Sequence, residues 1–200
     1  MKLVTFNDKE YLKNLLLSDK VIAFPTETVF GLGAISSSEK AFNNLVKVKN
    51  RTPDKPFTLM CSNVEQIKKF AVVDEVSAKL IKKFMPGSIT LILKVLPNVP
   101  KYITLGTEFI GVRIPENKEL IDLIDYVGEP LLVPSANKSG DAPALTHEQV
   151  KEIFDKEISA CVKGTVNKSV PSTIVKVDNG IISLLRNGPI KYEDILKEIE

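Results

Sequence analysis

The sequence predicts an α/β fold in which a twisted, mixed parallel and antiparallel sheet is flanked by helices. Short apolar runs typical of buried strands alternate with amphipathic helical patterns. Some strand patterns follow one another with only a turn between them, as at Asp178-Asn179-Gly180, so the sheet is not purely parallel. The 200 residues suffice for one hydrophobic core, and we expect a single domain over residues 1–200.

Helix caps and prolines divide the first half of the chain into elements. Four polar residues that favour helix N-caps each precede an amphipathic run: Asp8, Ser38, Asn63 and Asp74. We expect the second helix to end near Asn50, because Pro53 and Pro56 prevent its continuation. Apolar runs predict strands at residues 21–24, 57–61 and 89–95.

The second half of the chain continues this alternation. Apolar runs predict strands at residues 109–114, 131–134, 159–162, 173–177 and 181–185. Helical patterns cover residues 117–126 and 192–199. Thr146 opens a further helix that continues through Phe154, which places His147 in its first turn.

Charge and hydropathy exclude several classes of protein. The formal net charge is only +2, which argues against binding of nucleic acids or membranes through a broad basic face, although a local basic patch stays open. No apolar run reaches the length of a bilayer span. The charged N-terminal residues do not form a signal peptide. We therefore expect a cytoplasmic protein without membrane contact.

The sequence offers few residues for a metal site or a nucleophilic triad. Cys61 and Cys161 lie far apart in apolar surroundings, and we expect both to be buried, reduced thiols. With one histidine, His147, a zinc site of the usual type is not available. Nothing around His147 indicates a Ser-His-Asp or Cys-His arrangement. We predict no metal site built from protein side chains.

A polar segment at residues 24–33 follows the first buried strand. Thr26, Glu27 and Thr28 could present hydroxyls and a carboxylate to a small ligand, because ligands bind at strand ends in open α/β sheets. Alternatively, the segment opens a helix that has Glu27 in its first turn and ends at Gly31 and Gly33.

Cations concentrate in residues 47–56, at the end of the second predicted helix. They are Lys47, Lys49, Arg51 and Lys55. The helix dipole favours cations at a helix C-terminus, so the pattern is also what an ordinary helix end requires. Alternatively, a loop stiffened by two prolines holds these cations ready for phosphate or carboxylate groups. We expect Lys49 and Arg51 to be exposed, so that their removal leaves the fold intact.

A third polar segment, residues 133–143, also follows a buried strand. Ser135 and Asn137 lie two residues apart, so in an extended segment their side chains point the same way. Residues 138–143 contain Gly140 and form either a mobile lid over a site or an ordered surface turn. The chain has neither a P-loop nor a Rossmann fingerprint, so a nucleotide would bind without either motif.

Six segments together carry a resemblance to a known family. They are residues 24–34, the Lys49-Asn50-Arg51 triplet, residues 111–115, Pro134-Ser135-Ala136-Asn137, residues 171–175 and residues 185–188. In this order they resemble the Sua5/YciO/YrdC family, and specifically its short, single-domain threonylcarbamoyl-AMP synthases. The resemblance implies a YrdC-like fold. Longer members carry a second C-terminal domain, which we do not expect here.

The resemblance implies a nucleotidyltransferase reaction. L-threonine, bicarbonate and ATP would give threonylcarbamoyl-AMP and pyrophosphate, on the route to the N6-threonylcarbamoyladenosine modification of tRNA. ATP is then a substrate, and Mg²⁺ is expected to accompany it, bound more by the nucleotide than by side chains. Separate partner proteins are expected to transfer the product to tRNA.

The resemblance also implies roles for individual residues. The residues implied in catalysis are Lys49, Arg51, Ser135 and Asn137. Those implied in ATP binding are Arg51, Lys55, Ser135, Pro143 and Arg186. Those implied in threonine binding are Thr28, Met60, Arg113, Val133 and Ser172. The chain departs from the family pattern at Phe30, where tyrosine is frequent, and at Met60, where histidine is frequent, so we expect no polar contact from position 60.

Two other functions stay open at this stage, as does membership of the branch of the family that does not carry out threonylcarbamoylation. An RNA-binding or ribosome-maturation module would use the cations near Lys49, with a sequence pI of about 8.4. However, aromatic residues make up only 6% of the chain and tryptophan is absent, which leaves few platforms for base stacking. The other is a carbamoyl-transfer domain like that of hydrogenase-maturation proteins, which also carry modules for which this chain has no room.

Overall fold

We describe a computed structural model of the chain, in which residues 1–50, 55–167 and 170–199 are placed. Arg51, one of the predicted site residues, lies outside these ranges. The strands are β1 (Lys2–Val4), β2 (Ile22–Pro25), β3 (Phe30–Ile35), β4 (Leu59–Met60), β5 (Ile89–Lys94), β6 (Phe109–Arg113), β7 (Leu131–Leu132), β8 (Ala160–Val162), β9 (Thr173–Asp178) and β10 (Ile181–Arg186). The helices are α1 (Lys9–Leu17), α2 (Glu39–Lys49), α3 (Val64–Lys68), α4 (Glu75–Phe84), α5 (Lys101–Thr104), α6 (Lys118–Val127), α7 (His147–Phe154) and α8 (Tyr192–Lys197).

The strands within the described residues form a ten-stranded sheet in the order β1-β8-β2-β3-β7-β4-β6-β5-β9-β10. Strands β1 and β2 both pair with β8 in parallel, and β4–β6 and β5–β9 are also parallel. The pairs β2–β3, β3–β7, β4–β7, β5–β6 and β9–β10 are antiparallel. The predicted mixed sheet is therefore confirmed.

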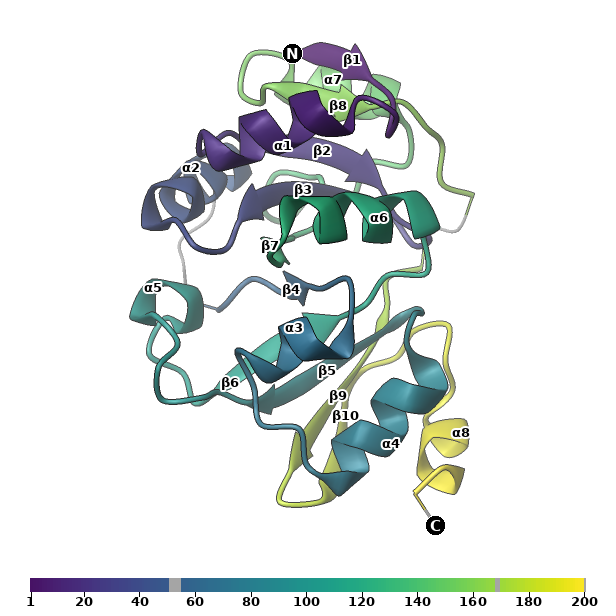
Figure 1. Cartoon of the computed structure of the whole chain (residues 1–200). Coiled ribbons are helices and arrows are strands. Elements are labelled where there is room, and N and C mark those ends of the chain that lie inside the picture. Colours follow the sequence, from purple (N-terminus) through teal and green to yellow (C-terminus); the bar gives the residue numbers. More distant parts are fainter. Residues whose placement is uncertain (51–54, 168–169, 200) are drawn as a thin grey trace.

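Helices cover the sheet along its whole length. Figure 1 shows α1 and α6 across the upper half of the sheet, and α3 and α4 across the lower half. The N-terminus lies beside β1 at one end of the sheet, and α8 carries the chain to its C-terminus at the other end. Leucine, isoleucine, valine and phenylalanine side chains from strands and helices form one buried cluster.

Local capping signals in the sequence are confirmed for most helices. The side chains of Ser38, Asn63, Asp74 and Thr146 each accept a hydrogen bond from the backbone N–H three residues later. Helix α2 ends where predicted, with Asn50 in the left-handed conformation. Asp8 is the exception, because its carboxylate accepts from the Thr5 N–H at 2.8 Å instead of capping α1.

The segment after β2 does not open a helix, because Phe30–Ile35 is the strand β3, and residues 26–29 connect it to β2. It forms a hairpin with β2 in which Phe24 pairs with Gly31. A Cβ on Gly33 would lie 2.4 Å from the Phe24 ring, and one on Gly31 would lie 2.7 Å from Val133 Cγ1. These glycines therefore allow the close approach of neighbouring side chains.

Candidate active site

A cleft of about 410 Å³ opens beside the β2–β3 turn, with walls contributed by segments far apart in the chain. It gathers ten of the predicted site residues: Thr28, Lys49, Met60, Arg113, Val133, Ser135, Asn137, Pro143, Ser172 and Arg186. Lys55 is exposed and is not among the wall residues, although its neighbour Pro56 is. Pattern and resemblance thus pointed to residues that the fold does bring together.

The cleft forms beside two short strands, and residues that flank these strands line it. Strands β4 and β7 pair through only two residues each. Beyond them, the Val133 N–H donates to Thr58 O at 2.8 Å, and both residues line the cleft. The observed strands are therefore shorter than the predicted ranges, 57–61 and 131–134. Residues that flank these strands line the cleft.

Two threonines in the β2–β3 turn form a directed hydrogen-bond chain. Thr26 Oγ1 donates to Val29 O at 2.7 Å, so its single proton is used there. The 3.0 Å contact between the two hydroxyls must then run from Thr28 Oγ1 to Thr26 Oγ1. This leaves Thr28 Oγ1 as an acceptor toward the cleft, which Thr28 lines.

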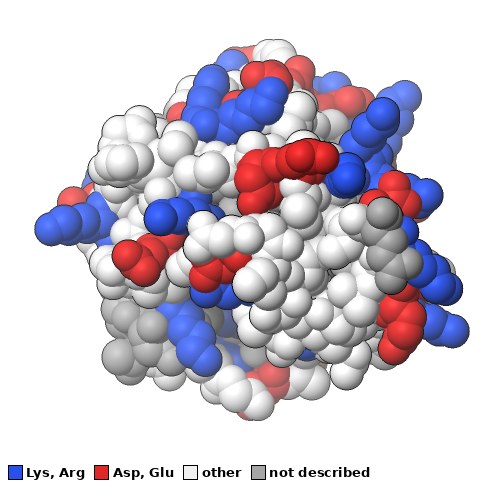
Figure 2. Space-filling model, turned by 90° about the horizontal axis from the view of Figure 1, so that it is seen from below, with Lys and Arg blue, Asp and Glu red and all other residues white. Residues whose placement is uncertain are grey.

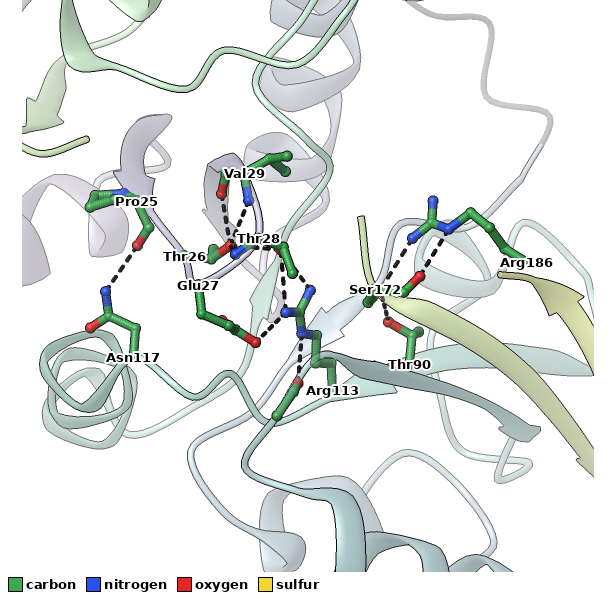
Figure 3. Close-up of polar contacts among 11 residues, drawn as sticks. Pro25, Thr26, Glu27, Thr28, Val29, Thr90, Arg113, Asn117, Ser172 and Arg186 are labelled. Atoms are coloured by element: carbon green, nitrogen blue, oxygen red, sulfur yellow. Dashed lines mark hydrogen bonds and ion pairs between the residues drawn. The ribbon is translucent and has the colours of Figure 1, made fainter. Parts of the chain in front are cut away.

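Arg113 supplies the donors to that acceptor. It is the last residue of β6 and is buried, with 6% of its surface exposed. Its Nη1 and Nη2 atoms both lie 3.3 Å from Thr28 Oγ1, and its Nε donates to Gly87 O at 3.2 Å. Nη2 also forms an ion pair with Glu27 Oε1 (Figure 3).

Lys49 lies in a cage of oxygen atoms. It is the last residue of α2, and only 4% of its surface is exposed. Its Nζ lies 2.7 Å from Ser135 O, 2.8 Å from Asn137 O and 2.7 Å from Asn137 Oδ1. The expectation that Lys49 is exposed is therefore wrong, because the 135–137 segment folds back over the end of α2.

The segment after β7 is held by several hydrogen bonds. Ser135 Oγ donates to Asn137 Oδ1 at 2.6 Å, and Asn137 Nδ2 donates to Lys138 O and Asp141 O at 2.7 and 2.9 Å. Lys138 Nζ in turn contacts Val48 O at 2.9 Å. We expected residues 138–143 to form either a mobile lid or an ordered surface turn. These contacts are consistent with the ordered turn.

Ser172 and Arg186 also line the cleft. Arg186 donates from Nε to Ser172 O at 3.0 Å and from Nη2 to Ser172 Oγ at 3.1 Å, and Ser172 Oγ lies 2.9 Å from Thr90 Oγ1. Figure 3 shows these groups beside the Arg113 cluster. Burial, and to a lesser degree the charge of Arg113, holds the pKa of Arg186 below its usual value. The charge of Arg113 thus reaches Arg186.

Sequence reasoning missed several wall residues. Thr90 is buried and lines the cleft, together with Thr26, which the polar segment at residues 24–33 had already indicated. Thr90 stands in an apolar strand, where a buried hydroxyl between large aliphatic residues was the available signal. Asp141 provides a carboxylate on the wall. Met60, by contrast, is 3% exposed and gives the cleft an apolar surface, as its side chain requires.

Other sequence-based expectations concern metals, thiols and membranes. Both cysteines are free and buried, as predicted. In the placed parts of the chain, no group of three or more His, Cys, Asp and Glu side chains is arranged to hold a metal ion. None of the helices in those parts is both long and apolar enough to cross a bilayer.

The molecular surface bears on the RNA-binding alternative. On the face shown in Figure 2, lysine and arginine side chains are interspersed with aspartate and glutamate, and a large uncharged area lies between them. Binding of RNA through the phosphate backbone favours clustered cations on one face. This face does not provide such a cluster.

The sequence pattern of one protein family matches this chain from residue 14 to residue 188. That span includes every cleft-lining residue. The chain belongs to the Sua5/YciO/YrdC family. The description of the family reads "Telomere recombination". Membership confirms the family predicted from the six sequence segments.

Two relatives are named threonylcarbamoyl-AMP synthase. The Buchnera aphidicola subsp. Acyrthosiphon pisum protein is 35% identical over 169 residues, which cover 83% of this chain and 97% of the relative. The Pyrococcus abyssi protein is 35% identical over 182 residues, which cover 90% of this chain and 54% of the relative. The chain thus spans nearly all of one Sua5/YciO/YrdC relative and about half of the other.

A solved structure supports the same placement. The crystal structure of P. abyssi Sua5 complexed with L-threonine matches with a TM-score of 0.93 at 31% identity. The match covers 99% of this chain and 60% of that chain. The YrdC-like fold is therefore confirmed over almost the whole length.

Proposed function

We propose that the chain is an L-threonylcarbamoyladenylate synthase, which converts L-threonine, bicarbonate and ATP into threonylcarbamoyl-AMP and pyrophosphate. The observation that carries this proposal is a single cleft with two arginines, Arg113 and Arg186, on its walls. Such a cleft suits a reaction that brings two anionic substrates together. The names of the relatives, and the threonine bound to P. abyssi Sua5, support the choice of substrates.

We place threonine at the Arg113 end of the cleft. The Arg113 guanidinium suits the substrate carboxylate, because its N–H donors match a carboxylate in geometry and charge. Thr28 Oγ1 would accept from the hydroxyl or amine of the substrate. Val133 and Met60 would contact its methyl group, and Ser172 would close the pocket from the other side.

We place ATP toward Arg186 and the 135–143 segment. Arg186 donates two N–H groups to Ser172, and a guanidinium carries five, so further donors are available to phosphate oxygens. Ser135 and Pro143 line the same cleft as Arg186. Lys55 and Arg51 would reach the triphosphate from the segment after α2, and Arg51 stays a prediction because it lies outside the described residues.

The proposed chemistry depends mainly on positioning. The threonine amine forms a carbamate, either with bicarbonate and loss of water or with CO₂ and loss of a proton. A carbamate oxygen then attacks the α-phosphorus and displaces pyrophosphate. Both partners are anions, so fixed cations on the wall lower the barrier by electrostatic stabilisation and alignment. Ser135 and Asn137 would hold the reacting groups from the segment that Lys49 fixes.

Lys49 is proposed to act as a positioning residue. An ammonium group has three N–H donors, and the three short contacts of Lys49 Nζ are all to protein oxygens. Its charge still contributes to the positive potential of the cleft. Its main effect would be to fix the backbone at Ser135 and Asn137.

Magnesium fits as a companion of ATP and not as a resident ion. Among the described wall residues, Asp141 offers a carboxylate, and one carboxylate alone does not make a metal site. Mg²⁺ commonly binds through substrate phosphates with one or two protein carboxylates. When bound, it would neutralise charge on the triphosphate, and Asp141 is the side chain that could reach it.

The wider setting of the reaction stays a prediction. We propose that residues 1–200 form a single domain of this type and that the protein acts in the cytoplasm. Other proteins would transfer the threonylcarbamoyl group to tRNA. Weak RNA binding by this chain also stays a prediction.

The direct test is mass spectrometry of the chain incubated with ATP, L-threonine and bicarbonate. We expect threonylcarbamoyl-AMP and pyrophosphate to form, and omission of any one substrate to abolish the adenylate. Arg186→Gln is the test variant and Lys191→Gln is its matched control. Each change removes one cation, but only Arg186 lines the cleft. Absence of the adenylate from the folded wild-type chain would refute the proposal.

A further inference from the structure

The two arginines of the cleft have different partners. Arg113 forms an ion pair with the Glu27 carboxylate. Arg186 donates to the backbone oxygen and the hydroxyl of Ser172, which are uncharged. Within the described part of the chain, none of the ion pairs includes Arg186. One guanidinium is therefore balanced by the protein, and the other is not.

Glu27 contacts Arg113 from outside the cleft lining. It stands between two cleft-lining threonines, yet it is not itself among the residues that line the cleft. Figure 3 shows its side chain extending to the Arg113 guanidinium from the β2–β3 turn. Only 12% of the Glu27 side chain is exposed, so its charge acts at a site that is largely screened from solvent.

The second oxygen of the Glu27 carboxylate lacks a described hydrogen-bond partner, which lowers the stability of the folded state. Glu27 Oε2 is buried, and no described residue hydrogen-bonds to it. A buried acceptor without a partner destabilises the folded state. The chain nevertheless places a full negative charge there, which points to a role for the charge.

The contacts of Arg113 show how an amino-acid carboxylate could enter. Its contacts to Thr28 Oγ1, at 3.3 Å, are longer than its contact to Glu27 and would yield first. A ligand carboxylate would then take these N–H donors, and Thr28 Oγ1 would be released to accept from the ligand. Glu27 would keep its own N–H and hold the guanidinium in place.

We infer that Glu27 is a specificity-determining residue that acts through Arg113. Its charge makes the Arg113 end of the cleft accept a singly charged carboxylate and reject phosphates, which carry more negative charge. Polyphosphates are thereby directed to Arg186, which forms no ion pair with a described carboxylate. This inference rests on the proposed function, because it assumes that an amino acid and a nucleotide share the cleft.

Calorimetric titration of L-threonine and inorganic pyrophosphate tests the inference without turnover. In the wild-type chain, we expect saturating pyrophosphate to leave the threonine affinity nearly unchanged. In Glu27→Gln, pyrophosphate should compete with threonine and weaken its apparent affinity on the order of tenfold, since one full charge at a partly screened site has about this effect.

Two further variants separate charge from packing. Glu27→Asp keeps the charge and should keep the wild-type pattern. Glu65→Gln removes the same charge from an exposed position on α3 and should also behave as wild type. Circular dichroism checks that each variant is folded.

The outcomes that overturn the inference are clear. One is a folded Glu27→Gln variant in which pyrophosphate still does not compete with threonine. The other, which needs no variant, is a wild-type chain in which pyrophosphate displaces threonine. Failure of the proposed function is distinguishable, because it would appear as absence of the adenylate while both ligands still bind.

Discussion

Replacement of Lys49 by methionine would test the cage at the end of α2. The change removes the ammonium group and keeps most of the aliphatic stem. It leaves Ser135 O, Asn137 O and Asn137 Oδ1 without the donor that lies 2.7–2.8 Å from each of them. The matched control is Lys47→Met, an exposed lysine in the same last turn of the helix.

The expected magnitude follows from these three contacts. A hydrogen bond from a charged donor contributes about 1.5–3 kcal/mol, but removal of a buried cation also removes its desolvation penalty, and the loop can relax toward water. We expect a net loss of about 2–4 kcal/mol for Lys49→Met, or a fall in melting temperature of about 5–15 °C for a domain of this size. Lys47→Met should change stability by about 0.5 kcal/mol or less.

Thermal unfolding and pyrophosphate release would be measured on both variants. Lys49→Met should lose about 100-fold in rate, because displacement of the 135–137 segment misaligns the reacting groups. If Lys49→Met were as stable as Lys47→Met and still inactive, the ammonium group would act on the substrates and not on the loop. Normal stability with normal activity would refute both roles.

Three other outcomes are expected. A chelator should stop pyrophosphate release, and added Mg²⁺ should restore it, without a change in melting temperature; a chelator-induced fall in melting temperature would indicate a structural ion. The kcat/KM for valine should be lower than that for threonine by roughly 10⁴ or more if a wall group pairs with the hydroxyl, whereas serine should lose only about 10–200-fold; equal turnover of valine would contradict this pocket. Burial, and to a lesser degree the charge of Glu148, raises the pKa of the Cys161 thiol from 9.0 to about 12. Between these values the folded state keeps a proton that the unfolded state loses. The free energy of unfolding should therefore fall as the pH rises from about 9 toward 12. A urea titration series should show a flatter alkaline decline for Cys161→Ala, and an identical decline would exclude this cause.

Local signals in the sequence predicted most of the secondary structure. A cap such as Ser38 or Asp74 depends on residues within one helical turn, so its neighbours in the sequence suffice to identify it. Strand β3 escaped prediction because its signal is not local. Gly31 and Gly33 are typical of turns and helix ends, and only the packing of Phe24 and Val133 explains why a strand requires them.

The sequence predicted most of the residues that line the site, but not which of them contact one another. Loops after buried strands were expected to hold ligands, and the cleft does form there. The burial of Lys49 was missed because its acceptors come from Ser135 and Asn137, more than eighty residues away in the sequence. A lysine at a helix end looks exposed until the segment that covers it is known. The Glu27–Arg113 pair is equally distant, with a separation of 86 residues.

The internal pairing has a consequence for how the cleft works. Lys49 and Arg113 contact protein oxygens, so groups of the protein hold them in position. Groups fixed in this way need no reorganisation as charge develops, which is the condition under which electrostatic stabilisation is most effective. Arg186 is anchored through Ser172 but has no described carboxylate partner, so in the proposed function its charge is available to the nucleotide. Under the proposed function, the cleft would therefore combine cations engaged by the protein, which shape the site, with Arg186, which the nucleotide would neutralise.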